Sequence, residues 1–189
     1  MILYLHGFRS SPQSFKARAM AQHLRELGRE SEFVCPQLSA SPRLAIVLAE
    51  SIIGTHLATQ KITLVGSSLG GYYATYLAEK FNLRAILLNP AVKPPNDLAK
   101  YIGVTTAFHS DEPFEFKASY VDELRDYAVP QISAPERYFL LAATGDEVLD
   151  WREMLAHYAA AKQIVIQGSD HGMADFVDYF ADIMAFCDA

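Results

Sequence analysis

The chain has 189 residues, of which 51% are hydrophobic and 20% are charged, and its formal net charge is −6. These values predict one globular domain over residues 1–189 and exclude a disordered chain. An acidic chain without a basic stripe is unlike a nucleic-acid-binding protein, so we expect no nucleic-acid partner.

Cysteine content and hydropathy predict the compartment. Two cysteines are too few for a disulfide framework, and we interpret Cys35 and Cys187 as buried or incidental thiols. The chain opens without the basic segment and long apolar run of a signal peptide, and no later run has the length of a membrane span. We expect a cytoplasmic protein with no membrane span, and no pattern in the chain specifies an oligomeric state.

Short apolar runs alternate with amphipathic runs in the first half of the chain. They predict strands over 2–5, 32–35 and 62–65, and helices over 14–27 and 43–57. Gly28 is the predicted stop of the first helix. The predicted inner face of that helix consists of Phe15, Ala19, Met20, Leu24 and Leu27. The residues at helical spacing in the second helix are Leu44, Val47, Leu48, Ser51 and Ile52.

The alternation resumes in the second half after one interruption. We predict strands over 85–88, 138–143 and 163–166, and helices over 150–161 and 173–187. The last helix is predicted to direct Phe176, Phe180, Ile183 and Met184 inward. Strands that alternate with helices favour an α/β fold with about six mainly parallel strands and helices on both faces.

Residues 91–135 form the interruption. Six of the nine prolines lie between Pro90 and Pro135, and no long period holds there, so we predict a cap-like insertion. Its aromatic residues form an acyl pocket in one interpretation and only pack the insertion onto the sheet in the other. These aromatics are Tyr101, Phe108, Phe114, Phe116, Tyr120 and Tyr127.

Residues 61–82 carry the motif with the clearest chemistry. An apolar strand leads directly into a glycine-rich turn and then into a helix, and Gly66 and Gly70 each lie two residues from Ser68. This is the G-x-S-x-G pattern of a nucleophile elbow, and it selects Ser68 over Ser67. The turn matches neither a dinucleotide fingerprint nor a P-loop.

Two residues after later strands supply the partners that a serine nucleophile needs. Asp146 follows the strand over 138–143 and His171 follows the strand over 163–166, so the chain order is Ser, Asp, His, as in α/β-hydrolase triads. We predict His171 as the general base and Asp146 as the carboxylate that orients it. Asp150 is the better substitute for Asp146, and Asp170 ranks below both.

The turn after the first strand predicts the second half of an oxyanion hole. The backbone N–H of Phe8, beside Gly7, would pair with the N–H of Leu69 to hold the developing negative charge. His6 has no partner in the sequence pattern, and we interpret it as a histidine that orders its loop.

A metal site is the weaker interpretation of the C-terminal acids. His171, Asp175 and Asp178 share a helical face at spacings of four and three, but three such ligands do not specify a site. The same acids are as well explained by the N-terminus of a helix, so we expect no metal.

With these residues assembled, the chain resembles the YqiA-type family of small bacterial α/β-hydrolases. The resemblance rests on residues 4–12, 65–75, 89–92 and 144–150 and on the His171 loop, and it is loosest over about 103–135. It implies a compact hydrolase core, no cofactor, and carboxylic-ester hydrolysis through Ser68, Asp146 and His171.

The sequence therefore favours a serine carboxylesterase that forms an acyl-enzyme on Ser68 with a small-molecule ester. A thioesterase with the same triad is the alternative, although the acidic insertion argues against coenzyme A esters. An alternative of another class is a hydrolase-fold protein that binds a ligand without catalysis.

Overall fold

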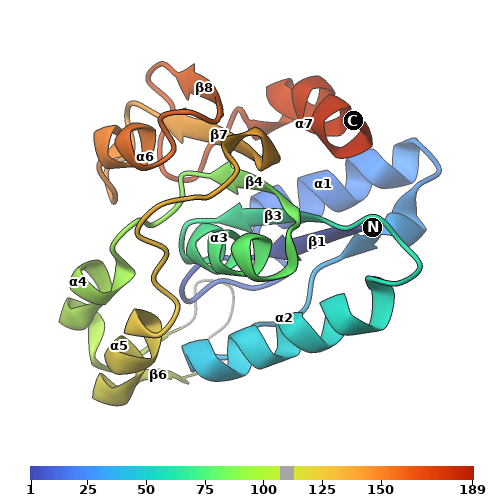
Figure 1. The fold of residues 1–189 in the computed structure, drawn as a ribbon. Coiled ribbons are helices and arrows are strands. Elements are labelled where there is room, and N and C mark those ends of the chain that lie inside the picture. The colour runs from blue at the N-terminus through green and yellow to red at the C-terminus, as the bar shows by residue number, and fades with distance from the viewer. Residues whose placement is uncertain (107–112) are drawn as a thin grey trace.

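The computed structural model describes residues 1–106 and 113–189. Within these residues a six-stranded sheet has the order β2-β1-β3-β4-β7-β8, and all neighbouring strands are parallel (Figure 1). The predicted α/β class and strand number are therefore confirmed. The strands are β1 (Ile2–Leu5), β2 (Phe33–Val34), β3 (Thr63–Ser67), β4 (Arg84–Leu88), β7 (Tyr138–Ala143) and β8 (Lys162–Ile166).

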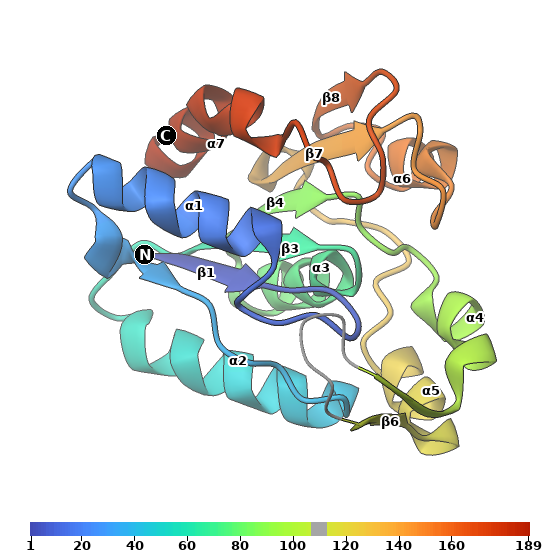
Figure 2. The same cartoon turned by 180° about the vertical axis from the view of Figure 1, so that it is seen from behind.

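Helices cover both faces of this sheet. Helices α2, α3 and α6 lie over one face in Figure 1, and α1 and α7 lie over the other face, which Figure 2 shows from behind. The helices are α1 (Phe15–Glu26), α2 (Pro42–His56), α3 (Leu69–Phe81), α6 (Trp151–His157) and α7 (Phe180–Asp188). Short 3-10 turns precede β2, β7 and α7 as η1 (Glu30–Glu32), η3 (Pro135–Arg137) and η4 (Phe176–Tyr179).

The sheet divides the core into two layers. Alternate strand residues face opposite sides, so Leu3 and Leu5 join the cluster under α2 and α3. Ile2 and Tyr4 join the cluster under α1 and α7. Because both faces are covered, the central strands are apolar throughout, which is why their sequence pattern was recognisable.

The buried face of α1 differs from the prediction at both ends. Met20 and Leu24 are buried as predicted, but Phe15 is 45% exposed and Leu27 is 50% exposed. Lys16 is buried instead, four residues before Met20 on the same helical face. A charged residue therefore occupies the inner face at the end of α1 nearest the carboxyl edge of the sheet.

The buried face of α2 also differs from the predicted set. Ala45 and Ala49 pack inward, whereas Leu44 is 59% exposed and Val47 is 55% exposed. This helix is apolar almost all round, so its periodicity did not identify the inner face. The inner face mixes small and large side chains, Ala45 and Ala49 with Ile46 and Ile53, while the equally apolar Leu44 and Val47 remain outside.

Two predicted helices are shorter in the structure. The helix expected over 150–161 ends at His157, and regular α-helix near the C-terminus begins at Phe180 rather than at residue 173. The residues before Phe180 form η4 and the turn in which Met173 has a positive φ of 52°. The four side chains predicted to point inward there are nevertheless all buried.

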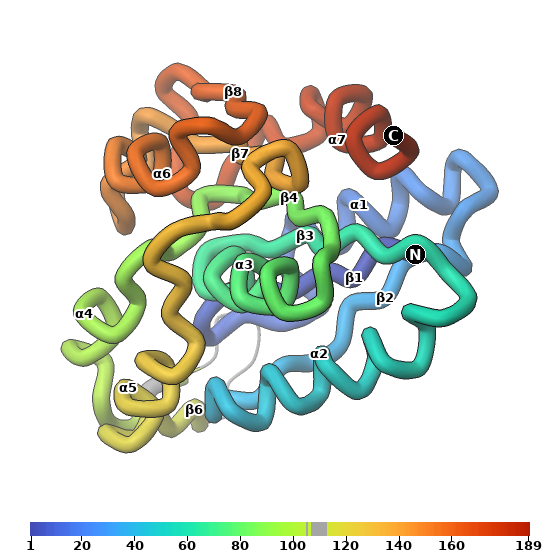
Figure 3. Tube along the Cα trace, viewed as in Figure 1, coloured from blue at the N-terminus to red at the C-terminus, as the bar shows by residue number. Residues whose placement is uncertain are grey.

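The segment over 91–135 leaves the sheet beyond the carboxyl end of β4. It contains α4 (Pro94–Leu98), η2 (Ala99–Tyr101), the antiparallel pair β5 (Gly103–Thr106) and β6 (Pro113–Phe116), and α5 (Ala118–Arg125). Figure 3 shows α4 and α5 to one side of the sheet, away from the N- and C-termini. Phe108 lies outside the described residues.

In the part of the chain that the structure describes, no helix is both long and apolar enough to cross a membrane.

Candidate active site

Ser68 lies at the turn between β3 and α3, with φ of 54° and ψ of −120°. This conformation is uncommon for a residue with a side chain, and it persists only where the surroundings enforce it. The Ser68 hydroxyl makes no capping hydrogen bond to α3. A strained residue at a strand-to-helix turn is the backbone geometry of a nucleophile elbow.

Positions 66 and 70, on either side of Ser68, have no room for a side chain. A Cβ on Gly66 would lie 2.3 Å from the carbonyl oxygen of Gly70, and a Cβ on Gly70 would lie 1.9 Å from that of Leu5. Both distances are far below van der Waals contact. The G-x-S-x-G spacing thus lets α3 begin directly against β1.

Backbone hydrogen bonds join the loops that follow β7 and β8. The amide of Thr144 donates to Ile166 O at 2.8 Å, and the amide of Gly145 donates to Ser169 O at 3.0 Å. A Cβ on Gly145 would approach Ser169 O to 2.8 Å. Contact this close brings the residues after each strand side by side.

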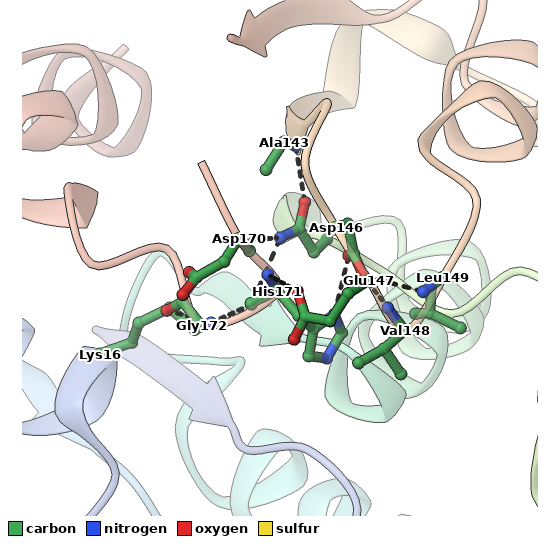
Figure 4. Close-up of polar contacts among 10 residues, drawn as sticks. Lys16, Ala143, Asp146, Glu147, Val148, Leu149, Asp170, His171 and Gly172 are labelled. Atoms are coloured by element: carbon green, nitrogen blue, oxygen red, sulfur yellow. Dashed lines mark hydrogen bonds and ion pairs between the residues drawn. The ribbon is translucent and has the colours of Figure 1, made fainter. Parts of the chain in front are cut away.

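The result is a hydrogen-bonded pair of Asp146 and His171 (Figure 4). Asp146 Oδ2 lies 2.7 Å from His171 Nδ1, and Asp146 Oδ1 accepts hydrogen bonds from the amides of Val148 and Leu149, each at 2.8 Å. The Asp146 side chain is fully buried, whereas that of His171 is 21% exposed. A carboxylate at Nδ1 assigns the proton to that nitrogen and leaves Nε2 as an acceptor.

Ser68 and His171 line the same two cavities. One has a volume of about 250 Å³ and reaches toward α1; we call it the α1-side cavity. The other, of about 180 Å³, reaches toward α4, and we call it the cap-side cavity. Among the described residues no hydrogen bond joins the Ser68 hydroxyl to the His171 ring, so a proton transfer between them requires closer approach than this structure has.

Two backbone amides beside Ser68 are unpaired. Within residues 1–106 and 113–189, neither the N–H of Phe8 nor that of Leu69 donates a hydrogen bond to the protein. Leu69 begins α3, where N–H groups have no intrahelical acceptor. A Cβ added to Gly7 would lie 3.7 Å from Ser68 Oγ, so the Phe8 loop passes close to the hydroxyl.

Sequence reasoning missed two residues that hold the His171 loop. Asn89 is fully buried at the end of β4; its Oδ1 accepts from Ala143 N at 2.8 Å, and its Nδ2 donates to Asp170 O at 3.1 Å. Lys16 Nζ donates to His171 O at 3.1 Å and to Gly172 O at 2.9 Å. The sequence did contain a signal for Lys16, because residues 16, 20 and 24 lie at helical spacing and two of them, Met20 and Leu24, were predicted to be buried.

Lys16 is a buried amine, and its burial changes its pKa. Burial lowers the pKa of its ammonium to about 8, against an opposing influence from the carboxylates of Asp146 and Asp170. The side chain is 8% exposed. At neutral pH the group remains mostly charged.

The other acids considered from the sequence do not hydrogen-bond to His171 through their side chains in the described structure. Asp150 is the N-cap of α6, where its carboxylate accepts from Arg152 N at 2.9 Å. Asp170 is exposed beside Gly172. Asp175 accepts a hydrogen bond from the Ser169 hydroxyl, and the described residues contain no group of three or more His, Cys, Asp or Glu placed to hold a metal ion.

His6 connects two loops. Leu38 N donates to its Nε2 at 3.0 Å, and its Nδ1 lies 3.0 Å from Gly7 O. These contacts fasten the Phe8 loop to the chain after β2, which fits the predicted ordering role.

The aromatics of residues 91–135 divide between lining and packing. Tyr101 lines the cap-side cavity with Ser68 and also contacts Phe8, at a ring-centroid distance of 5.6 Å. Phe114 and Phe116 contact Phe8 edge-on, at 5.2 and 5.0 Å. Tyr127 packs against Tyr76. Within the described part of this segment, Tyr101 therefore lines a cavity beside Ser68, and Phe114, Phe116 and Tyr127 pack against other aromatic rings.

The cysteines are poor competitors as nucleophiles. Burial raises the pKa of the Cys35 thiol to about 12 and that of Cys187 to about 11. Both are free thiols, and little of either is a thiolate near neutral pH.

The parallel sheet, the strained serine turn and the acid and histidine at neighbouring strand ends define an α/β-hydrolase fold. Solved structures agree on this fold. Mouse alpha/beta hydrolase domain-containing protein 10 matches with a TM-score of 0.76 at 18% identity, over 99% of this chain and 89% of that one. Est1E from Butyrivibrio proteoclasticus with bound ferulic acid matches with a TM-score of 0.75 at 14% identity, over 99% and 86%. The esterase domain of a Rhodothermus marinus protein matches with a TM-score of 0.69 at 15% identity, over 97% and 83%.

The family model described as "Uncharacterised protein family (UPF0227)" matches residues 1–188, and the chain belongs to this family. The resemblance to YqiA-type hydrolases inferred from the sequence is thereby confirmed.

Proposed function

We propose that the protein is a serine carboxylesterase that hydrolyses small-molecule esters through an acyl-enzyme on Ser68. His171 accepts the Ser68 proton through Nε2 and returns it to the leaving alcohol, while Asp146 stabilises the imidazolium. The observation that carries the proposal is the 2.7 Å contact of Asp146 with a histidine that shares both cavities with Ser68.

The unpaired amides of Phe8 and Leu69 are the proposed oxyanion hole. Preorganised N–H groups stabilise the negative charge that develops on the ester carbonyl oxygen, and they need no reorganisation during the reaction. In the same proposal, the segment over 91–135 is a cap that supplies one wall of the substrate site, and the protein acts in the cytoplasm.

The first test is the loss of the nucleophile. Ser68→Ala is expected to lower kcat for a 4-nitrophenyl ester by about 10⁴-fold or more, because only the oxyanion hole and binding remain. Ser67→Ala tests the neighbouring hydroxyl and is expected to retain most of the turnover. Undiminished hydrolysis by correctly folded Ser68→Ala would contradict the proposal.

Esterase and thioesterase use the same triad, so substrates must separate them. Matched oxygen and sulfur esters with the same acyl group are expected to show the higher kcat/KM for the oxygen ester, relative to their uncatalysed rates. A strong preference for the sulfur ester would favour the thioesterase. Ser68-independent binding without turnover of either would favour a non-catalytic binding protein.

A further inference from the structure

The two cavities beside Ser68 differ in chemistry. The cap-side cavity is lined by apolar side chains such as Leu98 and Leu149 and also by the charged residues Arg9, Asp97 and Lys100. The α1-side cavity contains Tyr4, Ser14 and Lys16 between β1, α1 and the His171 loop. An ester that reacts at Ser68 directs its acyl and alcohol halves away from the carbonyl in different directions, so the halves meet different surroundings.

Among the described residues, the Lys16 ammonium uses two of its three N–H donors. An ammonium carries three N–H donors. Among the described residues, two are used on the carbonyl oxygens of His171 and Gly172. Figure 4 shows Lys16 reaching the His171 loop from α1. The remaining donor belongs to a charged group that is 8% exposed and lines the cavity.

Two hydroxyls in the same lining lack partners. By distance and angle, the buried Tyr4 hydroxyl and Ser14 Oγ have no hydrogen-bond partner in the part of the chain that the structure describes, although the Ser67 side chain lies close enough to the Tyr4 hydroxyl to favour its ionised form. Tyr4 is 0% exposed. A buried polar group without a partner costs about 1–3 kcal/mol, so a ligand that bonds to such groups recovers that cost on binding.

We propose that the α1-side cavity binds a carboxylate on one half of the ester, with Lys16 as its counter-ion and the Tyr4 and Ser14 hydroxyls as additional hydrogen-bonding groups. The preferred substrates are then esters that carry a free carboxylate a few bonds from the ester carbonyl or from the ester oxygen. This inference rests on the proposed esterase function and names its substrate class.

The charges nearest this cavity are the Lys16 ammonium and the carboxylates of Asp146, Glu147 and Asp170. The Asp146 carboxylate is held by His171 and two backbone amides, that of Glu147 accepts from the His171 amide at 3.1 Å, and Asp170 is exposed to solvent. The three carboxylates oppose an anion, so its binding depends on the Lys16 charge in the lining. Burial without an anionic ligand is costly for the Lys16 ammonium, as its lowered pKa of about 8 indicates. A carboxylate in the cavity would compensate that charge directly.

Isosteric ester pairs isolate the effect of charge. Monoethyl succinate is compared with ethyl succinamate for the acyl half, and 3-acetoxypropanoate with 3-acetoxypropanamide for the alcohol half. In at least one pair, wild type is expected to favour the carboxylate by about tenfold or more in kcat/KM at pH 7, the range of a charged hydrogen bond. A preference for the amide, or none, in both pairs would overturn the inference.

Lys16 variants locate the effect. Lys16→Met and Lys16→Gln are expected to bring the carboxylate-to-amide ratio to about one or below, and Gln retains an N–H donor group should Met impair folding. Because each ratio compares two substrates of one variant, weaker support of the His171 loop cancels. An equal loss for both members would instead assign Lys16 a structural role only and contradict the inference.

Lys100→Met is the matched control, since Lys100 lines the cap-side cavity. It is expected to change the carboxylate-to-amide ratio by no more than about twofold. A ratio that falls to about one in this variant alone would place the carboxylate in the cap-side cavity and contradict the inference. Failure of the proposed function looks different: no Ser68-dependent hydrolysis of any of the four esters would overturn both proposals.

Discussion

The two walls beside Ser68 differ in how firmly they are built. The α1-side wall comes from β1 and the start of α1, and its residues also fill the core or hold the His171 loop, as Tyr4 and Lys16 do. The cap-side wall comes from the short elements α4 and η2, where Tyr101 is 37% exposed. One wall is therefore tied into the core, and the other is more exposed to solvent.

Loss of the Asp146 carboxylate is expected to give the largest effect on activity, because it changes the proposed base, His171, which lines both cavities. Asp146→Asn is expected to lower kcat/KM by about 10³–10⁴-fold, because the amide no longer fixes the histidine tautomer or stabilises its charge. Steady-state kinetics with one small ester measures it. Asp150→Asn is the control, since Asn also caps helices, and a larger loss there would mean that Asp150 is the acting acid.

Steric crowding at the elbow tests how tightly the start of α3 packs against the end of β1. Gly70→Ala places a Cβ 1.9 Å from Leu5 O, and the unfolding free energy is expected to fall by about 3 kcal/mol or more. Urea denaturation measures the change. Gly54→Ala in α2 has open space around the new Cβ and is expected to gain up to about 1 kcal/mol. Equal stability of the two variants would contradict the packing that we describe.

The protonation of Lys16 links the α1-side wall to pH. Its pKa is about 8 in the folded protein and 10.5 as the ordinary value, so between these the unfolded chain binds more protons and folding stability rises with pH. The stability difference between wild type and Lys16→Met is expected to shift in favour of wild type by about 2 kcal/mol from pH 7.5 to 9.5. Denaturation of both proteins at each pH measures it, and a constant difference would mean that the pKa of Lys16 is not lowered.

The cap-side wall should give the smallest effect. Leu98→Ala removes part of an apolar, half-buried lining and is expected to raise KM by up to about tenfold for an ester with a longer apolar half, with little change in kcat. Val104→Ala, at a side chain that is 74% exposed, is the control. A large loss of kcat in Leu98→Ala would show that this wall is as rigid as the other.

The same contrast explains what the sequence could predict. Strands β1, β3, β4 and β7 are buried on both faces, so their apolar runs were unambiguous, and the glycines around Ser68 marked the turn through steric need. Asp146 was identifiable because it follows β7, and His171 because it follows β8, an edge strand whose short apolar run was still recognisable. Their mutual distance was not, because it depends on backbone contacts between two loops.

The inner faces of α1 and α2 show where pattern reasoning fails. Lys16 is buried because two backbone carbonyls of a distant loop accept its hydrogen bonds, a contact that no local pattern contains. In α2 the inner face consists of Ala45, Ile46, Ala49 and Ile53, and the equally apolar Leu44 and Val47 point outward, a choice that the periodicity could not make. Tertiary contacts decided both outcomes.

Fluorophosphonate labelling followed by peptide mass mapping tests the central claim most directly. Wild type is expected to acquire one phosphonyl group on Ser68, at a rate that Asp146→Asn lowers strongly, and Ser68→Ala is expected to remain unlabelled. Modification of Ser67 instead, or equal labelling of folded Ser68→Ala, would contradict the account.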